Sequence, residues 1–225
     1  LLLFLEFVNE LIKRFKYIVL DTPAGGVNHL SSLMNSIDQV LFIFDMSNSI
    51  AVNGSIDALH SFIDYYEDFS KDFKEGHLTG LDKAFVNRLV ASRGEEAVIE
   101  MLSNKKFGII FNRCQSSKEI SKCLDQLREY LDTLDRFEKY KDRIHMVGMV
   151  PHHKIINITN NRGTLFYDKD SSLSKCINLV AENILSENQN CPTLSNQNQE
   201  ILNFLQKKGK GSWASRFSKI ASSVG

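Results

Sequence analysis

The chain of 225 residues has little proline, little cysteine and no net charge. It contains three prolines and four cysteines, and its 27 basic side chains are balanced by 27 acidic ones. So few prolines exclude a collagen-like or linker-dominated protein, and the balanced charge argues against a uniformly basic nucleic-acid binder. A hydrophobic share of 43% is instead typical of a globular protein that can bury a sizeable core.

The cysteines are widely and irregularly spaced, and no Cys-x-x-Cys pair occurs. They are Cys114, Cys123, Cys176 and Cys191. We interpret them as reduced thiols in a reducing compartment rather than as a disulfide framework or a structural zinc site.

The apolar start of the chain, residues 1–8, is interrupted by Glu6 and followed by charged residues. It is too short for a membrane span and lacks the basic region and cleavage site of a signal peptide. Its apolar spacing favours a helix, and we expect the chain to begin inside a domain.

Four short apolar runs predict buried strands, and stretches long enough for crossover helices separate or follow them. The runs lie at 17–20, 40–44, 107–111 and 144–150, and the helical stretches at 27–36, 50–66, 116–139 and 171–186. None of the runs alternates between polar and apolar residues, which is typical of strands buried on both faces. The order predicts an α/β fold with a mostly parallel sheet flanked by helices on both faces.

Three stretches depart from this rhythm. The polar residues 67–104 carry helical spacing and predict a helical insertion within a domain that covers residues 1–187. Residues 188–200 are rich in Asn, Gln and Ser and predict a flexible polar linker. Residues 201–225 predict a basic amphipathic tail helix.

The most informative motif is Tyr17-Ile-Val-Leu-Asp-Thr-Pro-Ala-Gly-Gly26. A buried parallel strand would deliver Asp21 to the carboxyl edge of the sheet, where ligands bind in open α/β folds. A carboxylate there can hold Mg²⁺ through water, and Gly25 would let the backbone approach a phosphate. The alternative is an Asp that bonds its own turn ahead of a helix.

This motif closely resembles the combined Walker B and switch II segment of the MinD/ParA family of deviant Walker A P-loop ATPases. Three later segments resemble landmarks of that family in the same order. Residues 107–113 resemble the strand whose terminal Asn recognises adenine, and 149–153 the strand that ends in Ile-Pro beside the base. Residues 160–166 resemble the Asn-Arg-Gly turn before the last helix. The resemblance covers about residues 4–187.

The resemblance implies a P-loop NTPase fold of the SIMIBI type, truncated at its N-terminus, with ATP and Mg²⁺ as cofactors. Asp21 would be the catalytic and magnesium-holding carboxylate, and Gly25 would sense the γ-phosphate. Asn112 and the backbone at Pro151 would bind adenine. The family's GKGGxGKT loop and its switch I aspartate precede this region and are absent from these 225 residues. The chain by itself is therefore expected to bind ATP poorly and not to turn it over.

Other polar residues at the expected strand ends have less specific interpretations. Asn112 could instead bond its own turn, and Arg113 could stack on a ligand or face solvent. Asp45 could support the site or face a partner, or belong to a solvated helix start. The adjacent His152 and His153 point in different directions and have no evident third ligand, so a metal site there is disfavoured.

The tail combines a narrow apolar stripe with basic residues and contains no acid. The stripe is Trp213, Phe217, Ile220 and Val224, and the basic residues are Lys207, Lys208, Lys210, Arg216 and Lys219. This pattern favours a helix on an anionic membrane surface and resembles the membrane-targeting helix of MinD-type proteins. Docking onto its own domain, binding of a partner and a disordered end remain alternatives.

Together these features predict a cytoplasmic ATPase, peripheral on the inner face of the cell membrane, that positions division or flagellar components. The FlhG-like branch is suggested by the insertion. The resemblance implies that ATP closes a homodimer and that hydrolysis, stimulated by a protein activator or cargo, releases it. Two alternatives are a non-hydrolysing scaffold of the same fold and a ParA-like DNA-partitioning ATPase. Nucleic acid is disfavoured because the first 200 residues carry 22 basic against 27 acidic groups.

Overall fold

The computed structural model describes most of the chain between the first helical turn and the end of the last helix. The described residues are 6–7, 10–11, 13–21, 37–133, 135–152 and 171–207. They divide into two compact units, one from Leu1–Asp38 with His60–Lys105 and one from Gln39–Leu59 with Lys106–Gly225.

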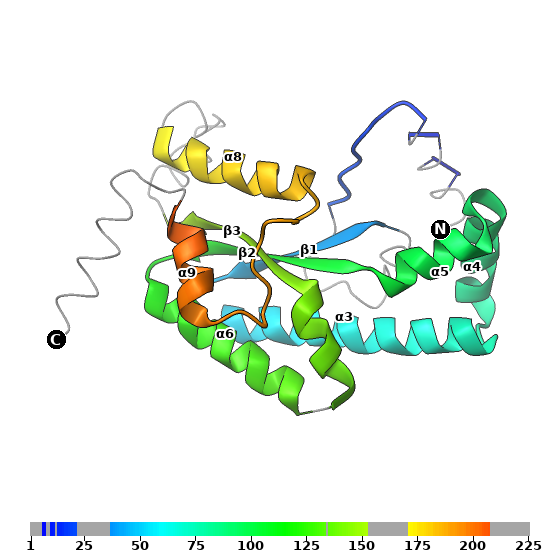
Figure 1. The fold of residues 1–225 in the computed structure, drawn as a ribbon, viewed down its shortest axis with the longest axis horizontal. Coiled ribbons are helices and arrows are strands. Elements are labelled where there is room, and N and C mark those ends of the chain that lie inside the picture. Colours follow the sequence, from blue (N-terminus) through cyan, green and yellow to red (C-terminus); the bar gives the residue numbers. More distant parts are fainter. Residues whose placement is uncertain are drawn as a thin grey trace. The chain divides into compact units, whose positions relative to one another are not determined.

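The second unit is built on a three-stranded parallel sheet (Figure 1). Its strands are β1 (Gln39–Asp45), β2 (Lys106–Cys114) and β3 (Ile144–Pro151), in the order β1-β2-β3. The strands predicted at 40–44, 107–111 and 144–150 are thus confirmed, as is their parallel pairing. Their continuous apolar sequences suit a sheet that is covered on both faces.

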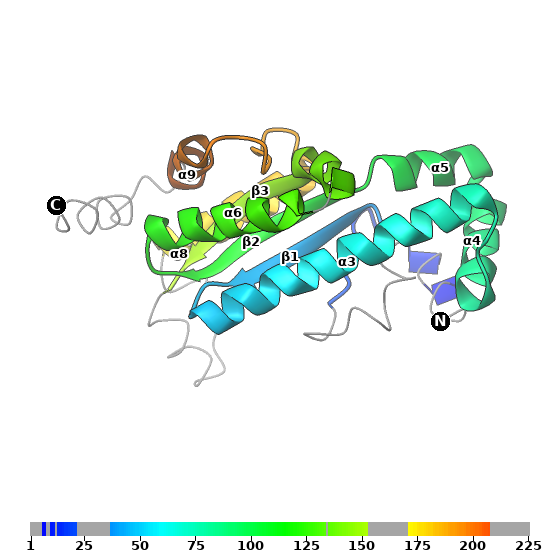
Figure 2. The same cartoon turned by 90° about the horizontal axis from the view of Figure 1, so that it is seen from below.

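Helices lie on both faces of this sheet (Figures 1 and 2). The start of α3 (Ser49–Glu75) and α6 (Ser117–Asp132) lie on one face, and α8 (Ser171–Leu185) lies on the other. The 3₁₀ segment η1 (Asp135–Arg143) leads from α6 into β3. The α/β character expected from the sequence is therefore confirmed.

Two local features fix α6 and α8. Ser116 and Glu119 form a reciprocal capping box at the start of α6, which satisfies two backbone N–H groups that the helix leaves unpaired. Gly148 of β3 faces α8, and a Cβ atom there would lie 2.6 Å from Val180 Cγ2. Only glycine allows α8 to approach the strand this closely.

The first unit is helical. It contains the second half of α3, then α4 (Gly80–Arg93) and α5 (Glu95–Ser103), so these helices occupy most of the stretch expected to form an insertion. Its core is aromatic and aliphatic, and the Tyr66 hydroxyl donates to the Leu102 carbonyl inside it. The fully or nearly fully buried side chains include Phe62, Ile63, Tyr66, Phe85 and Val98.

Lys105 is the last residue of this unit and is buried, with 1% of its surface exposed. Its ammonium donates to the Ile37 carbonyl at 2.7 Å and lies 5.9 Å from the centre of the Tyr66 ring. Burial lowers the pKa of Lys105 from 10.5 to about 7, although the nearby Asp38 opposes this shift. Burial at this position therefore favours the uncharged form of the lysine.

Residues 17–20 do not form the expected strand. In the part of the chain that the structure describes, they lie outside the sheet as irregular chain, with Tyr17 and Val19 exposed. A four-residue run has too few backbone hydrogen bonds to remain a strand without a paired neighbour. The pattern of apolar residues identified a β-prone segment but could not show that it pairs.

The expected flexible linker at 188–200 is wrong in its central part, because this segment packs against the sheet edge. Thr193 forms an antiparallel bridge with His145 of β3. The Met146 N–H donates to the Pro192 carbonyl at 2.8 Å, and the Leu194 N–H donates to the Ile144 carbonyl at 2.9 Å. Residues 192–194 therefore cover the edge of β3, and the Leu194 side chain is fully buried.

A second set of contacts fastens the same segment to α6. The Arg128 guanidinium donates to the carbonyls of Leu194 at 2.9 Å and Asn196 at 2.7 Å, and also to the Asn198 side chain. Asn198 in turn donates to the Ser121 hydroxyl at 2.9 Å. We call residues 191–198, with these partners, the C-terminal clasp.

The helix α9 (Asn198–Lys207) follows the clasp and lies beside α6, with Ile201 and Leu205 buried (Figure 1). It begins inside the expected linker, three residues before the predicted tail helix at 201–225. Residues 208–225 lie outside the described part of the chain. Residues 198–207 thus pack onto their own unit, while the alternatives for the apolar stripe of the tail stay predictions because that stripe lies outside the described residues.

All four cysteines lie within the described residues and remain thiols, as predicted. Burial raises the pKa of the Cys114 thiol, and that of Cys123 to about 12, so neither forms a thiolate near neutral pH. Among the described helices, none combines the length and the apolar character that crossing a bilayer requires.

Candidate functional site

The carboxyl ends of β1 and β2 bring Asp45 and Asn112 together. The two residues are register partners in the parallel ladder, so their side chains face the same side of the sheet. On the other side of β2, Pro151 of β3 is the register partner of Cys114. Asn112 and Pro151, the two residues expected to contact adenine, thus lie at the ends of adjacent strands, at the edge where α/β sheets bind ligands.

Asn112 is half-buried and is held by its own turn. Its Oδ1 accepts a hydrogen bond from the Arg113 N–H at 3.0 Å, and its carbonyl accepts one from the Met46 N–H at 2.8 Å. The first bond is the one expected for an Asn that stabilises a turn. Among the described residues, the Nδ2 group has no hydrogen-bond partner and remains available to an acceptor.

Arg113 occupies an irregular position at the end of β2. Its φ is 60°, in the left-handed region, and the ladder with β3 shifts register between Asn112 and Cys114. For a residue with a Cβ atom this conformation costs about 1–2 kcal/mol. Hydrogen bonds to the residues on either side maintain this backbone conformation. The Asn112 carbonyl accepts from the Met46 N–H at 2.8 Å, and the Cys114 carbonyl accepts from the His152 N–H at 2.9 Å.

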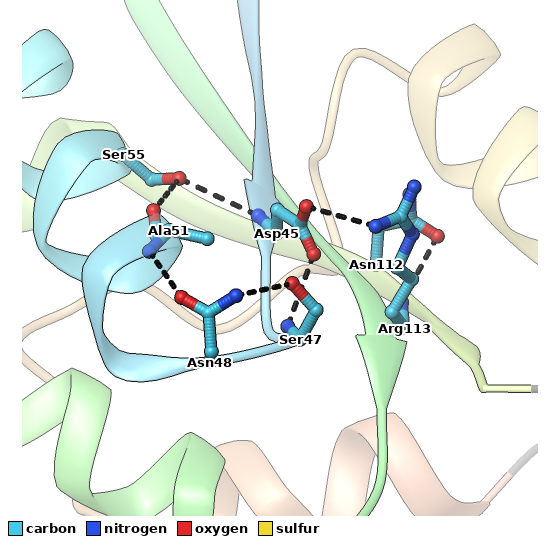
Figure 3. A network of polar contacts seen from close by, with 7 residues as sticks. All are labelled: Asp45, Ser47, Asn48, Ala51, Ser55, Asn112 and Arg113. Carbon is cyan, nitrogen blue, oxygen red and sulfur yellow. Dashed lines mark hydrogen bonds and ion pairs between the residues drawn. The ribbon is translucent and has the colours of Figure 1, made fainter.

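The side chain of Arg113 reaches Asp45. One guanidinium nitrogen, Nη1, lies 3.3 Å from Asp45 Oδ2, while Asp45 Oδ1 accepts from the Ser47 N–H at 3.0 Å (Figure 3). The Arg113 side chain is 55% exposed and that of Asp45 36%. An ion pair this exposed contributes at most about 1 kcal/mol to stability.

The turn after Asp45 leads into α3 and is also hydrogen-bonded. Asn48 Oδ1 accepts from the Ala51 N–H at 2.9 Å and caps the helix. Ser55, one turn later, donates to the Ala51 carbonyl at 2.9 Å and accepts from the Asp45 N–H at 3.4 Å (Figure 3). These bonds connect β1 to α3. We call Asp45, Ser47, Asn48, Asn112 and Arg113 the carboxyl-end cluster.

The residues predicted to hold magnesium, phosphate or a membrane are not among the residues of this cluster. Asp21 is exposed and belongs to the first unit, outside the sheet. Gly25 lies outside the described residues, as do most of the tail residues expected to meet a membrane, namely Lys208, Trp213, Arg216, Phe217 and Ile220. Lys207 is the last residue of α9.

Of the residues that the structure describes, Asp21 is the one carboxylate that the sequence predicts as a magnesium ligand. Among the described residues, no group of three His, Cys, Asp or Glu side chains is spaced to hold a metal ion. Mg²⁺ accepts a site with one protein carboxylate when water and phosphate oxygens supply the remaining ligands. Asp21 therefore fits magnesium only together with a bound phosphate group.

Sequence reasoning did not anticipate the ion pair between Asp45 and Arg113. Its local signal is weak, because an Asp after one strand and an Arg after another are ordinary turn residues. The contact depends on the register between β1 and β2 and on the left-handed backbone of Arg113, and neither is encoded in a short motif.

Comparisons of the chain with protein-family models, curated proteins and solved structures found no match.

Proposed function

We propose that this chain belongs to a P-loop-type ATPase of the MinD/ParA kind, which positions cellular components at a membrane. One observation supports this most. The two segments that resemble the family's adenine-binding strands, 107–113 and 149–153, include the ends of the neighbouring parallel strands β2 and β3. Motifs 36 or more residues apart in the sequence thus meet at one edge.

Asn112 offers the chemistry for recognising adenine. Its Nδ2 can donate to a ring nitrogen of the base. Its Oδ1 has two lone pairs and can accept from the exocyclic amine in addition to the Arg113 N–H. The backbone at Pro151 would border the base on the neighbouring strand.

The phosphates would be held elsewhere. Asp21 would hold Mg²⁺ together with phosphate oxygens, and Gly25 would lie at the γ-phosphate. The P-loop that the resemblance places ahead of this region would supply the main phosphate contacts. A magnesium ion bound there would offset part of the negative charge of the phosphates. ATP would close a homodimer, and hydrolysis stimulated by an activator would open it.

Binding of ATP in the presence of magnesium by the full-length gene product tests this proposal. We expect micromolar affinity that falls at least about tenfold in Asn112→Ala, since about 1.4 kcal/mol is lost with the base contacts. Asp21→Ala should weaken binding only when magnesium is present. Asn203→Ala, an exposed asparagine on α9, is the matched control and should bind as the wild type. A folded full-length protein that binds no ATP would overturn the proposal and favour the scaffold alternative.

Binding assays on the same protein preparation distinguish a membrane partner from a DNA partner. We expect the full-length protein with ATP to sediment with vesicles that contain anionic lipid, and Phe217→Glu to reduce this binding because a charge enters the apolar stripe. Retention on duplex DNA without vesicle binding would instead support the partitioning ATPase.

A further inference from the structure

Arg113 combines a strained backbone with an exposed side chain at the ligand-binding edge of the sheet. It is the extra residue of a bulge, because Asn112 pairs with Val150 and Cys114 with Pro151. The carbonyls on both sides of it accept hydrogen bonds from Met46 and His152, which follow β1 and β3. The backbone is thus fixed in a conformation that costs energy, and such conformations concentrate at functional sites.

The bulge redirects the guanidinium. In a regular strand, successive side chains point to opposite faces, so Arg113 would point away from the face that carries Asp45 and Asn112. A bulge residue in the left-handed region re-aims its side chain. The observed contact between Nη1 and Asp45 Oδ2 places the guanidinium on the same side as Asn112 (Figure 3).

Asp45 holds the guanidinium in a defined way. Its Oδ1 is fixed by the Ser47 N–H, and its Oδ2 meets one of the five N–H donors that an arginine carries. A hydrogen bond made in the guanidinium plane leaves the two flat faces uncovered by that partner, which agrees with an arginine side chain that is 55% exposed.

The opposite charges of Asp45 and Arg113 favour an aromatic ligand over a phosphate. Asp45 cancels the charge of Arg113, so the pair gives little net attraction to a phosphate. A planar guanidinium can lie flat against an aromatic ring, whereas a lysine ammonium is a point charge that gains only the cation–π attraction. The neighbouring Asn112 presents hydrogen-bonding groups to the edge of such a ring.

We propose that Arg113 stacks on the purine base whose edge Asn112 bonds, and that Asp45 is the positioning residue that aims the guanidinium. This inference rests on the proposed function and assigns a role to two residues of the same site.

The test compares ATP with inorganic tripolyphosphate, which has the phosphates but no base, as ligands of the full-length gene product. Arg113→Lys keeps the charge and loses the plane. We expect it to weaken ATP binding about five- to tenfold and to leave tripolyphosphate binding unchanged. Arg88→Lys, another exposed arginine in an ion pair, is the matched control and should bind both ligands as the wild type.

Asp45→Asn adds a second variant. Its affinities for ATP and tripolyphosphate are compared in the same way, and we expect the preference for ATP to fall in Asp45→Asn and further in Arg113→Lys, with unfolding midpoints confirming folded variants. Equal loss of both ligands in Arg113→Lys would place the guanidinium on phosphate, and no loss of either would remove it from the site. Both outcomes overturn the inference while wild-type binding of ATP still supports the proposed function.

Discussion

Arg113 of the carboxyl-end cluster and Arg128 of the C-terminal clasp differ in how fully the fold uses their side chains. Arg128 is 22% exposed and donates to two backbone carbonyls and two side chains. Arg113 is 55% exposed, meets one carboxylate and has a strained backbone. The comparison indicates that the clasp arginine stabilises the fold, whereas the cluster arginine remains available to a ligand.

Leu194 is the apolar anchor of the clasp, and removing its side chain should give the largest loss of stability. Leu194→Ala deletes a fully buried side chain and leaves a cavity, so we expect the free energy of unfolding to fall by about 3 kcal/mol. Urea denaturation measures this change. Leu185→Ala, a leucine that is half exposed on α8, is the control and should change stability by less than about 1 kcal/mol. Similar losses in the two variants would mean that the clasp does not dock in solution.

Arg128→Ala tests the polar half of the clasp. The carbonyls of Leu194 and Asn196 would lose charged hydrogen bonds, and we expect a loss of about 2 kcal/mol in urea denaturation. Arg128→Lys should recover little of it, because an ammonium lacks the planar fork that reaches both carbonyls. Arg113→Ala removes only an exposed ion pair and should cost less than about 1 kcal/mol. The reverse ranking of the two alanine variants would contradict the assigned roles.

Lys105 is less exposed than either arginine, because only 1% of its surface is accessible. Burial lowers its pKa to about 7 in the folded chain, against 10.5 for an unperturbed lysine. Between these values the unfolded chain binds a proton that the folded chain does not, so stability rises with pH. We expect a gain of about 1 to 2 kcal/mol between pH 7 and about pH 8.5.

Lys105→Met should abolish most of this slope, as measured by urea denaturation at several pH values. The series stops below pH 9, where buried thiols act in the opposite direction. The pKa of Cys123 is raised to about 12, so the unfolded thiol ionises first and stability then falls. A slope that persists in Lys105→Met would assign the effect to another group.

The smallest effect concerns the strain at Arg113. Glycine adopts a φ of 60° without steric cost, so Arg113→Gly should raise the free energy of unfolding by about 1 kcal/mol relative to Arg113→Ala. Thermal or urea denaturation of this pair isolates the backbone contribution, because both variants lack the guanidinium. Equal stability would mean that the left-handed conformation relaxes in solution.

The sequence predicted the strands at 40–44, 107–111 and 144–150 correctly because continuous apolar, β-branched runs favour buried strands. The similar run at 17–20 forms no strand in the described structure, because the pattern does not show whether a run finds a paired neighbour. The prediction failed at 188–200 because composition reports only how polar a segment is. Asn198 and Leu194 become ordered through Arg128 and the edge of β3, which lie about 50 to 70 residues away in the sequence. No local pattern of Asn, Gln and Ser contains that information.

The candidate site also has one part that the local sequence predicted and another that depends on distant contacts. The motif at 107–113 placed Asn112 at the end of a strand, and the run ending at Pro151 placed a neighbour beside it, because parallel strands end at a common edge. The local sequence did not reveal the bond from the Arg113 N–H to Asn112, nor the reach of Arg113 to Asp45. Those contacts follow from strand register and from one left-handed residue.

The sequence by itself determined the α/β class and the three parallel strands that the structure describes, since both follow from local composition and apolar pattern. Only the tertiary structure decided that the polar segment after α8 covers the edge of β3 and that a bulge turns Arg113 toward Asp45. Both outcomes depend on hydrogen bonds between segments distant in the chain, which form only once the sheet has set their geometry.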